Sequence, residues 1–308
     1  GNTSSCTTTV TVVDQTPPTL TCLEDQIVAV DNTCSFVVPN YVPSLIALDN
    51  CNTLSVTQNP LPGTILGVGT TPVTVTATDG SFDTLCNFTI IVADQTAPTA
   101  ICQNIILPLN QNGLATISST DIDFGSSDNC GSITASLDIT AFSCNDIGDN
   151  LVALTITDQG GLVSTCTAIV TVVDTLAPQI LTQDSTIYLD GNGQVSITPQ
   201  DIDAGSTDNC GIVSSTIDIT SFDCSNIGEN TVTLTLTDAS GNIATATATI
   251  TVVDATAPTA VCQNITIALD ASGNASITPQ DIDAGSFDNC DASQIAISQT
   301  NFDCSTIG

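Results

Sequence analysis

The chain has 308 residues, of which 32 are acidic and none is Lys, Arg or His, so its formal net charge is −32. Globular proteins usually carry about 25% charged residues of both signs, and nucleic acids and anionic membrane surfaces are bound through basic patches. We therefore expect neither as a partner. A hydrophobic fraction of 41% excludes acidic disorder, which combines high net charge with low hydrophobicity.

Membrane and targeting segments are not expected in this stretch. Apolar residues occur in short alternating runs, whereas a membrane helix needs about 18 or more in succession. No signal peptide precedes the first strand-like run, and the chain does not begin with Met. It starts inside that run and stops partway through a repeat, so we expect a segment of a longer protein whose targeting signals lie outside it.

A short marker recurs every 80 residues and divides the chain. It reads "VVDQTPP", "VADQTAP", "VVDTLAP" and "VVDATAP", with its Asp at positions 14, 94, 174 and 254. A fixed period indicates tandem modules, and 80 residues can support a small domain when covalent staples help. The predicted domains are the last strand of a preceding repeat (1–14), three complete repeats (15–94, 95–174 and 175–254) and an incomplete one (255–308).

The pattern within a repeat predicts strands. Thr alternates with apolar residues in 231–237 and 244–253, as in strands with one buried face, and turn sequences stand at 190–193 and 238–242. No window has a convincing helical period. The fold class is therefore all-β, with tandem immunoglobulin-like β-sandwich domains. Because the linkers are only D-x-T-x-P, we expect these domains to stack end to end as a rod.

Comparison of the repeats predicts the cysteine pairing. Repeat 95–174 has four cysteines, and repeat 175–254 has Thr182 and Ala246 in place of the outer two. Cysteines lost together are expected to bond together, which leaves the middle two as an inner pair. The predicted pairs are Cys22–Cys86, Cys102–Cys166, Cys34–Cys51, Cys130–Cys144, Cys210–Cys224 and Cys290–Cys304.

Cys6 and Cys262 are expected to pair with cysteines outside this stretch. With every cysteine assigned to a bond, an oxidising, extracellular setting is indicated.

An Asp-rich loop occurs once in each of the last three repeats. It reads "DIDFGSSDNC" from 121, "DIDAGSTDNC" from 201 and "DIDAGSFDNC" from 281. In an end-to-end arrangement, the predicted strand directions return this loop to the end where the chain enters each domain, beside the linker Asp and the last turn. The aspartates predicted to converge are Asp94, Asp121, Asp123, Asp128 and Asp158; Asp174, Asp201, Asp203, Asp208 and Asp238; and Asp254, Asp281, Asp283 and Asp288.

Two interpretations of these aspartates stay open. Carboxylates without basic neighbours repel unless a hard cation lies among them, and Ca²⁺ takes six to eight oxygen ligands from Asp-rich loops. Mg²⁺ prefers fewer carboxylates, and the absence of His and of free thiolate argues against Zn²⁺ or Cu²⁺. The other interpretation is that the aspartates cap a short helical turn after "TPQ" and solvate the loop. The absence of counter-charges favours structural calcium.

The repeats resemble a known family. The mid-repeat "DNC" and the closing "GENTVTLTLTDASGNIATATATITVVDATAP" are similar to HYR-type, immunoglobulin-like repeats. Repeat 15–94 resembles the ordinary HYR pattern, and the others resemble the variant in giant secreted surface proteins of Bacteroidota, such as SprB-like gliding-motility adhesins. The resemblance implies type 9 secretion, a cell-surface location and a role in adhesion or as a filament. It also implies O-glycosylation in short Asp-Ser/Thr triplets at Thr84, Thr175 and Ser185.

Catalysis is not expected, because no His or Lys is present to activate a Ser nucleophile and a carboxylate pair would need an aromatic-lined cleft. The function predicted is a calcium- and disulfide-stiffened stalk of a surface adhesin or filament, with further repeats of the same chain as partners. The alternatives are repeats that bind surface glycans or neighbouring cells or associate laterally, and an accessory array of a secreted enzyme. Binding surfaces usually expose aromatics, and Tyr41 and Tyr188 are expected to be packing residues.

Overall fold

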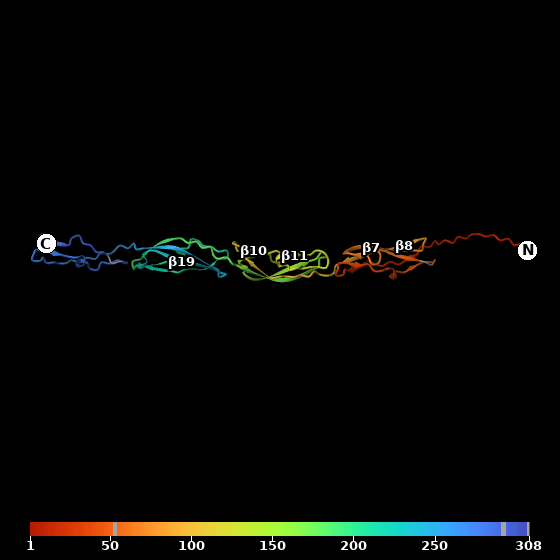
Figure 1. Cartoon of the computed structure of the whole chain (residues 1–308), viewed down its shortest axis with the longest axis horizontal. Coiled ribbons are helices and arrows are strands. Elements are labelled where there is room, and N and C mark those ends of the chain that lie inside the picture. The colour runs from red at the N-terminus through yellow and green to blue at the C-terminus, as the bar shows by residue number, and fades with distance from the viewer. Residues whose placement is uncertain (52–53, 291–293, 307) are drawn as a thin grey trace. The chain divides into compact units, whose positions relative to one another are not determined.

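The computed structural model describes residues 1–51, 54–290, 294–306 and 308. Its regular elements are strands with a few single helical turns, as the alternating pattern predicts (Figure 1). In chain order they are β1 (Thr19–Leu20), β2 (Gln26–Ala29), β3 (Phe36–Val37), η1 (Val42–Ser44), β4 (Ala47–Leu48), β5 (Ser55–Asn59), β6 (Ile65–Leu66), β7 (Gly69–Thr78), β8 (Asp83–Ala93), β9 (Ile105–Pro108), β10 (Leu114–Thr116), α1 (Ser119–Ile122), β11 (Thr134–Leu137), β12 (Ala141–Ser143), η2 (Cys144–Asp146), β13 (Gly148–Thr157), β14 (Val163–Val173), β15 (Ser185–Tyr188), β16 (Gln194–Ser196), η3 (Pro199–Asp201), β17 (Ile212–Ile217), β18 (Ser221–Asp223), η4 (Cys224–Asn226), β19 (Gly228–Asp238), β20 (Ile243–Val253), β21 (Asn274–Ser276), α2 (Pro279–Ile282), β22 (Asn301–Asp303) and η5 (Cys304–Thr306).

Contacts group the chain into two compact units. The first consists of Gly1–Ile106, Thr116–Ala141 and Gly148–Thr171, and the second of Leu107–Ala115, Phe142–Ile147 and Val172–Gly308. The grouping cuts through repeat 95–174, because two of its segments contact the following repeat. The domain boundaries drawn from the 80-residue period remain a prediction.

The first unit contains four-stranded sheets with the strand orders β2-β8-β7-β5 and β11-β13-β14-β9, and the strand pairs β1-β4 and β3-β6. The alternating residues of β7 and β8 bury one face of the first sheet, with Val73, Val75 and Ile90 fully enclosed. Tyr41 packs edge-on against Phe88 with 5.2 Å between ring centroids, so the expectation that Tyr41 is a packing residue is confirmed.

The second unit contains a four-stranded sheet, β15-β20-β19-β17, and the pairs β16-β18, β10-β12 and β21-β22. Val232, Leu234 and Leu236 on β19 face a core that also holds Phe222 of β18, while the intervening Thr side chains face the other way. Two sheets thus enclose one apolar layer, the arrangement of a β-sandwich. The predicted all-β fold of tandem β-sandwiches is confirmed.

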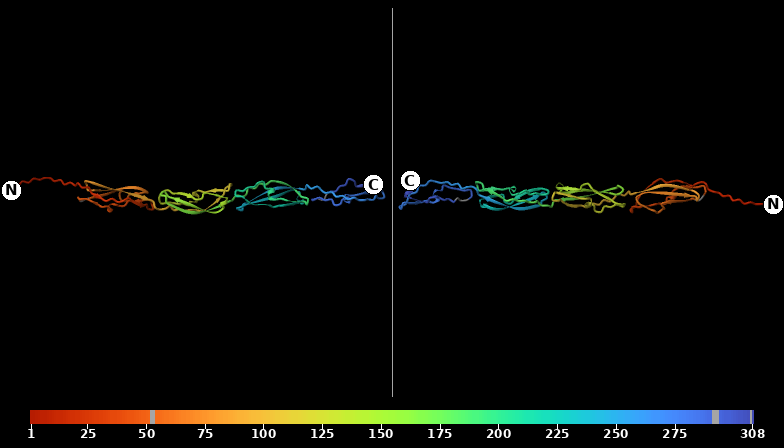
Figure 2. Two further views of the ribbon diagram at one scale, coloured as in Figure 1. Left: turned by 180° about the vertical axis from the view of Figure 1, so that it is seen from behind. Right: turned by 90° about the horizontal axis from the view of Figure 1, so that it is seen from above.

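Strand directions decide which loops share an end of the sandwich. β15 pairs in parallel with β20, so the first and last strands of repeat 175–254 run the same way; β2 and β8 do likewise in repeat 15–94. Because β19 is antiparallel to β20, β19 ends where β20 begins, at the end at which the chain enters. Figure 2 shows the strands from two further directions.

In the described part of the chain, no helix is both long and apolar enough to cross a membrane.

Replacing a core leucine tests whether the alternating pattern carries the stability. Leu234 is fully buried and Leu181, in the same repeat, is 52% exposed. Leu234→Ala should lower the free energy of unfolding by about 2–5 kcal/mol, because it removes buried methyl groups and leaves a cavity. The matched Leu181→Ala should change it by less than about 0.5 kcal/mol. Urea unfolding of both variants measures the difference, and equal losses would contradict the burial described above.

Candidate metal centre and junction disulfides

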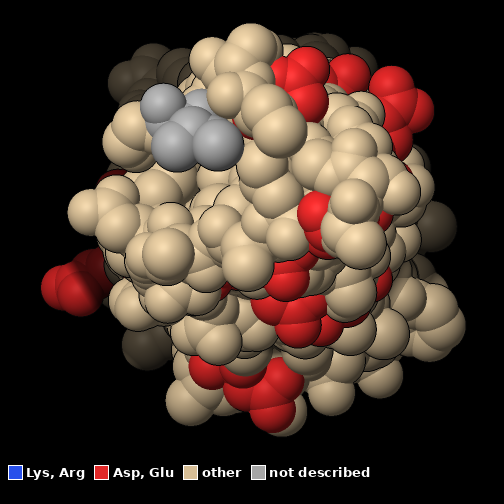
Figure 3. Space-filling view, turned by 90° about the vertical axis from the view of Figure 1, so that its left-hand side faces the viewer, with Lys and Arg blue, Asp and Glu red and all other residues tan. Residues whose placement is uncertain are grey.

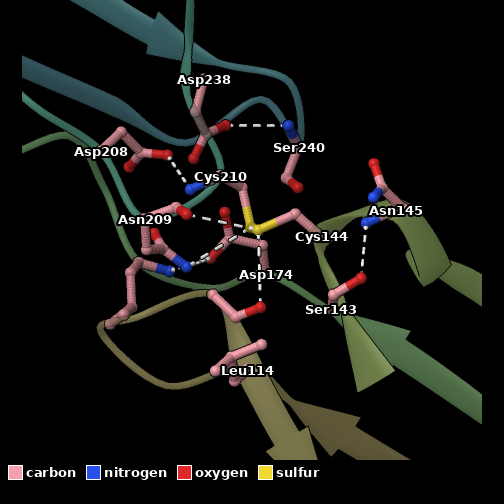
Figure 4. The surroundings of a disulfide bond; sticks show 12 residues. Leu114, Ser143, Cys144, Asn145, Asp174, Asp208, Asn209, Cys210, Asp238 and Ser240 are labelled. Atoms are coloured by element: carbon pink, nitrogen blue, oxygen red, sulfur yellow. Dashed lines mark hydrogen bonds between the residues drawn. A yellow bond between two sulfur atoms is a disulfide. The ribbon is translucent and has the colours of Figure 1, made fainter. Parts of the chain in front are cut away.

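Three of the predicted aspartates of the second unit meet at one point (Figure 4). Asp174 follows β14, Asp208 lies in the loop before Cys210, and Asp238 ends β19. One carboxylate oxygen from each lies within 4.8 Å of the others. We call these three residues the second junction cluster. In the first unit, Asp94, Asp128 and Asp158 form the equivalent first junction cluster, with the same limit on their separation.

Backbone and amide groups position the second junction cluster. The N–H of Leu176 and the Nδ2 of Asn209 donate to Oδ1 of Asp174, at 3.1 and 3.0 Å. Asp238 Oδ1 accepts from the N–H groups of Ser240 and Asn242, at 2.9 and 2.8 Å.

Hydrogen bonds also hold the loop that carries Asp208 and the linker that begins at Asp174. The N–H of Cys210 donates to Oδ2 of Asp208, at 2.9 Å. Asn242 Nδ2 also donates to the backbone oxygens of Asp174 and Leu176, at 3.2 and 3.1 Å. The last turn of the repeat is thereby tied to the linker that begins it.

Several buried oxygens at these clusters have no hydrogen-bond donor. Asp174 is only 6% exposed and Asp158 likewise 6% exposed, yet each leaves its Oδ2 unpartnered. A buried oxygen without a partner costs free energy, so each cluster has the donor set of a cation site. The atoms that share this condition are Asp94 Oδ2, Asp128 Oδ1, Asn129 Oδ1 and Asp158 Oδ2 in the first unit, and Asp174 Oδ2, Asp208 Oδ1 and Asn209 Oδ1 in the second.

Charge repulsion makes the clusters unstable on their own. Two unit charges no more than 4.8 Å apart repel by at least about 3.5 kcal/mol at an effective dielectric constant of about 20. The chain contains no Lys, Arg or His that could offset this repulsion. On the face shown in Figure 3, acidic side chains lie among uncharged ones without a basic residue. No basic side chain of the chain can supply a counter-charge to these clusters.

The first aspartate of each Asp-rich loop has a different role from the one predicted. Asp201 Oδ2 accepts from the N–H and the hydroxyl of Thr198, at 2.6 and 2.9 Å, and completes a capping box at η3. Asp121 and Asp281 do the same for α1 and α2. Among the described residues, Asp121, Asp201 and Asp281 are not members of these clusters; their carboxylates bond the helical turns that follow the second strand.

The second aspartate of each loop also binds its own loop. Asp203 Oδ1 accepts from the N–H and hydroxyl of Ser206, at 2.9 and 2.6 Å, and these bonds, led by the hydroxyl, hold the pKa of Asp203 below its ordinary value. The pKa values of Asp123 and Asp283 are lowered by Ser126 and Ser286 in the same way. Asp123, Asp203 and Asp283 belong to none of the three-residue groups within the ranges that the structure describes. The capping interpretation describes the first Asp of the "DID" motif, whereas the carboxylate of the second bonds its own loop.

In the third predicted group, Asp254 and Asp288 have surroundings like those of the junction-cluster aspartates. Asn289 Nδ2 donates to Oδ1 of Asp254 at 3.1 Å, and the buried oxygens Asp288 Oδ1 and Asn289 Oδ1 have no partner.

Sequence reasoning missed the asparagines Asn129, Asn209 and Asn289, although each stands within the repeated "DNC". It also missed a group at the start of the chain. Asp14, Asp49 and Cys51 place their ligand atoms within 4.8 Å of one another, and buried oxygens of Asp49 and Asp79 are unpartnered. The marker Asp14 and the first "DNC" at 49–51 were the signals that could have located this group.

The described residues contain five disulfides. Two of them, Cys22–Cys86 and Cys102–Cys166, are the outer bridges expected from the paired loss of cysteines in repeat 175–254. In that repeat Thr182 replaces the first outer cysteine, and its hydroxyl donates to the carbonyl of Thr247 at 2.9 Å. A hydrogen bond thus joins the two segments where the two preceding repeats have a covalent bond.

The predicted inner bridges are wrong, because each inner cysteine bonds to a neighbouring repeat. The observed bonds are Cys34–Cys130, Cys144–Cys210 and Cys224–Cys290, in place of Cys34–Cys51, Cys130–Cys144, Cys210–Cys224 and Cys290–Cys304. We call these three the junction disulfides.

Strand direction explains the observed pairing. β17 is antiparallel to β19 and so runs in the direction of β20, starting at Ile212 beside Asp238. β18 ends at Asp223 beside Gln194, which follows the turn after Tyr188 at the far end of β15. Cys210 precedes β17 and Cys224 follows β18, which places the two sulfurs at opposite ends of the sandwich. Each therefore meets a cysteine of the adjoining repeat.

Two different positions supply the sulfur at equivalent junctions. Cys144 Sγ lies beside the turn that contains Gly113, and a Cβ on Gly113 would approach that sulfur to 2.6 Å. In repeat 15–94 the turn itself carries Cys34, whose φ of 58° matches the left-handed 70° of Gly113. A cysteine is seldom found in this backbone region. A turn glycine makes room for the sulfur in one repeat, and a turn cysteine provides it in the other.

Among the described residues, Cys6, Cys51, Cys262 and Cys304 are free and exposed. The predicted glycosylation residues Thr84, Thr175 and Ser185 remain predictions. Thr175 is exposed, whereas the Thr84 hydroxyl donates to the carbonyl of Pro18 at 2.6 Å.

Comparisons with known proteins indicate the type of repeat. Residues 13–92 match the HYR domain model. Hyalin of Strongylocentrotus purpuratus is 32% identical over 282 residues, which are 84% of this chain and 23% of Hyalin. The chain thus spans less than a quarter of that relative. The two matches support HYR-type, immunoglobulin-like repeats.

Solved structures also match at low identity. A titin I-band fragment is 11% identical, with 78% of this chain and 100% of the fragment covered and a TM-score of 0.37. Mouse cadherin-23 EC22-24 is 13% identical, with 78% and 100% covered and a TM-score of 0.31.

A turn-glycine substitution tests the packing at the junction. Gly193 has a φ of 72°, and its added Cβ would lie 2.6 Å from Cys224 Sγ and 2.8 Å from the carbonyl oxygen of Asn289. Gly205 has a φ of 96° and open space around its Cβ, so it carries at least the same backbone cost. Gly193→Ala should lower stability by about 1–3 kcal/mol more than Gly205→Ala, because of overpacking. Thermal unfolding of both variants decides this, and a larger loss for Gly205→Ala would refute the close packing.

Proposed function

We propose that the junction clusters bind Ca²⁺ and that the chain is a calcium- and disulfide-stiffened stalk segment of an extracellular adhesin or filament. The observation that supports calcium most directly is the set of buried, unpartnered carboxylate and amide oxygens in a chain without basic side chains. Asp174, Asp208 and Asp238, with Asn209 beside them, would hold one ion. Asp94, Asp128 and Asp158, with Asn129, would hold another.

The size of the clusters fits calcium. Ca²⁺ binds oxygen at about 2.3–2.6 Å, so two ligands on opposite sides of the ion lie about 4.6–5.2 Å apart. The ligand atoms of each cluster lie within 4.8 Å of one another, close enough to share one ion. Ca²⁺ is favoured over Mg²⁺ because it accepts more carboxylate and carbonyl oxygens in a flexible arrangement, whereas Mg²⁺ demands near-octahedral geometry. The ion would neutralise the carboxylates that join the linker, the "DNC" loop and the last turn.

The positions of the junction clusters and the junction disulfides support a stalk role. Both the junction clusters and the junction disulfides connect residues on either side of a linker, so each would restrict motion between repeats. Disulfides are stable in oxidising compartments, and the five bridges together with the HYR match indicate an extracellular protein. The likeness of the later repeats to Bacteroidota adhesins supports a cell-surface filament, type 9 secretion and gliding motility as the finer proposal.

A second candidate function is binding by the repeats themselves. Tyr188 was expected to be a packing residue, but it is 60% exposed; Phe124 and Phe287, both within the Asp-rich loops, are also exposed. Exposed aromatic side chains are common in binding surfaces for glycans and proteins. This observation favours surface binding as an additional role and gives no reason to replace the stalk.

Calcium removal tests the proposal as a whole. The full chain in 2 mM Ca²⁺ should melt at a higher temperature than in excess EGTA, because an ion that binds only the folded state stabilises it by mass action. Adding 2 mM Mg²⁺ to the EGTA-treated, dialysed chain should restore little of this difference. Identical melting temperatures with and without Ca²⁺ would exclude structural calcium sites.

Two charge-matched variants separate the cluster from the caps. Asp208→Asn and Asp203→Asn each remove one negative charge from the same loop. By calorimetric titration, Asp208→Asn should bind one Ca²⁺ fewer than the wild type, whereas Asp203→Asn should keep the wild-type stoichiometry. The stability of Asp203→Asn should change by less than about 0.5 kcal/mol, because the amide retains an Oδ1 that can accept from Ser206. Loss of the ion in both variants would show that the ligand set extends beyond the junction cluster.

A further inference from the structure

The junction disulfides divide the chain into residues that can transmit tension and residues that cannot. Cys34 bonds Cys130 across 96 positions, and Cys144–Cys210 and Cys224–Cys290 each span 66. The spans follow one another without overlap. A force applied at the two termini therefore has a continuous covalent route that skips most of each repeat.

We propose that the junction disulfides make the chain almost inextensible, so that tension does not unravel its β-sandwiches. The shortest covalent route, which we call the pulling path, runs through residues 1–34, 130–144, 210–224 and 290–308 and three S–S bonds. The proposal adds a mechanical function to the proposed stalk. It depends on bond connectivity alone and holds whether or not the junction clusters bind calcium.

The length available along the pulling path is small. A fully extended chain spans at most about 3.3–3.6 Å per residue, so the 14 steps from Cys210 to Cys224 reach about 50 Å. An unbridged 80-residue repeat would reach about 280 Å. Complete loss of non-covalent structure in a bridged repeat would therefore release less than a fifth of that length.

The strands on the pulling path lie at the margins of the sandwich. In the second unit, residues 210–224 form β17, at the edge of the sheet β15-β20-β19-β17, and β18, one of a two-stranded pair. The central strands β19 and β20, which supply much of the buried core, lie between Cys224 and Cys290 and outside the path. Tension can displace edge strands while the hairpin that carries the core bears no load.

The outer disulfides have no part in limiting extension. Cys102–Cys166 joins two residues that are both off the pulling path, and its span of 64 positions nearly equals the 66 of a junction disulfide. Repeat 175–254 lacks the outer bridge, yet the connectivity predicts that it extends no more than its neighbours.

Single-molecule force spectroscopy on the full chain tests the proposal. All variants carry Ser at Cys6, Cys51, Cys262 and Cys304, which are free and exposed, so that handles at the termini define the pull. The oxidised chain should reach a contour length of about 300 Å, and the chain with its bridges reduced under load about 1,080 Å.

Two double variants with nearly equal spans provide the matched comparison. Cys224→Ser/Cys290→Ser should add about 230 Å to the contour length of the oxidised chain, from the 66 positions freed. Cys102→Ser/Cys166→Ser should add none, although it removes a similar constraint on the unfolded state.

Three results would overturn the proposal: unfolding steps of about 280 Å in the oxidised chain, equal contour lengths for the two double variants, or no lengthening on reduction. Reducing the wild-type chain under load provides the test if a double variant fails to fold. Repeating the pull in EGTA should leave the contour length unchanged, whereas failure of the calcium proposal would appear in the melting experiment alone.

Discussion

Burial of carboxylates in a chain that has no basic side chain is the constraint on which the junctions depend. Asp174 and Asp238 are almost wholly buried, and no Lys, Arg or His can offset their charge. Backbone N–H groups and asparagine amides satisfy only some of their oxygens. The remaining oxygens point to a cation from outside, and the linker, the loop and the last turn would then be held by one ion.

The "DNC" loop connects this electrostatic constraint to the covalent one. Asp208 contributes a carboxylate, Asn209 an amide, and Cys210 a sulfur bonded to the preceding repeat. The N–H of Cys210 donates to the carboxylate of Asp208. Three consecutive residues thus serve the cluster and the disulfide together, so the loop cannot shift without disturbing both.

Stability and resistance to tension are carried by different parts of a repeat. The buried residues of β19 and β20 supply the core, whereas the junction disulfides carry the covalent route past it. In repeat 95–174 the sulfur of Cys144 lies against the turn glycine Gly113, whereas in repeat 15–94 the turn itself carries Cys34. A sulfur therefore lies at this turn in both repeats. Supplying the sulfur by two routes is consistent with a requirement for a covalent link at the three junctions that carry the junction disulfides.

The residue pattern alone establishes the strands, the 80-residue period, the outer disulfides and the abundance of carboxylates without counter-charges. Alternation of Thr with Val, Leu or Ile leaves one face of β19 to bury, and the joint loss of cysteines at Thr182 and Ala246 identifies their pairing. The cysteines equivalent to Cys130 and Cys144 occur together in the last three repeats, so their counts cannot distinguish bonds within a repeat from bonds between repeats. Only the strand directions, which place Cys210 and Cys224 at opposite ends of one sandwich, decide this. The tertiary structure likewise gives Asp201 and Asp208 different roles. Asp201 caps a helical turn and Asp208 joins the cluster, because different backbone groups face their identical carboxylates.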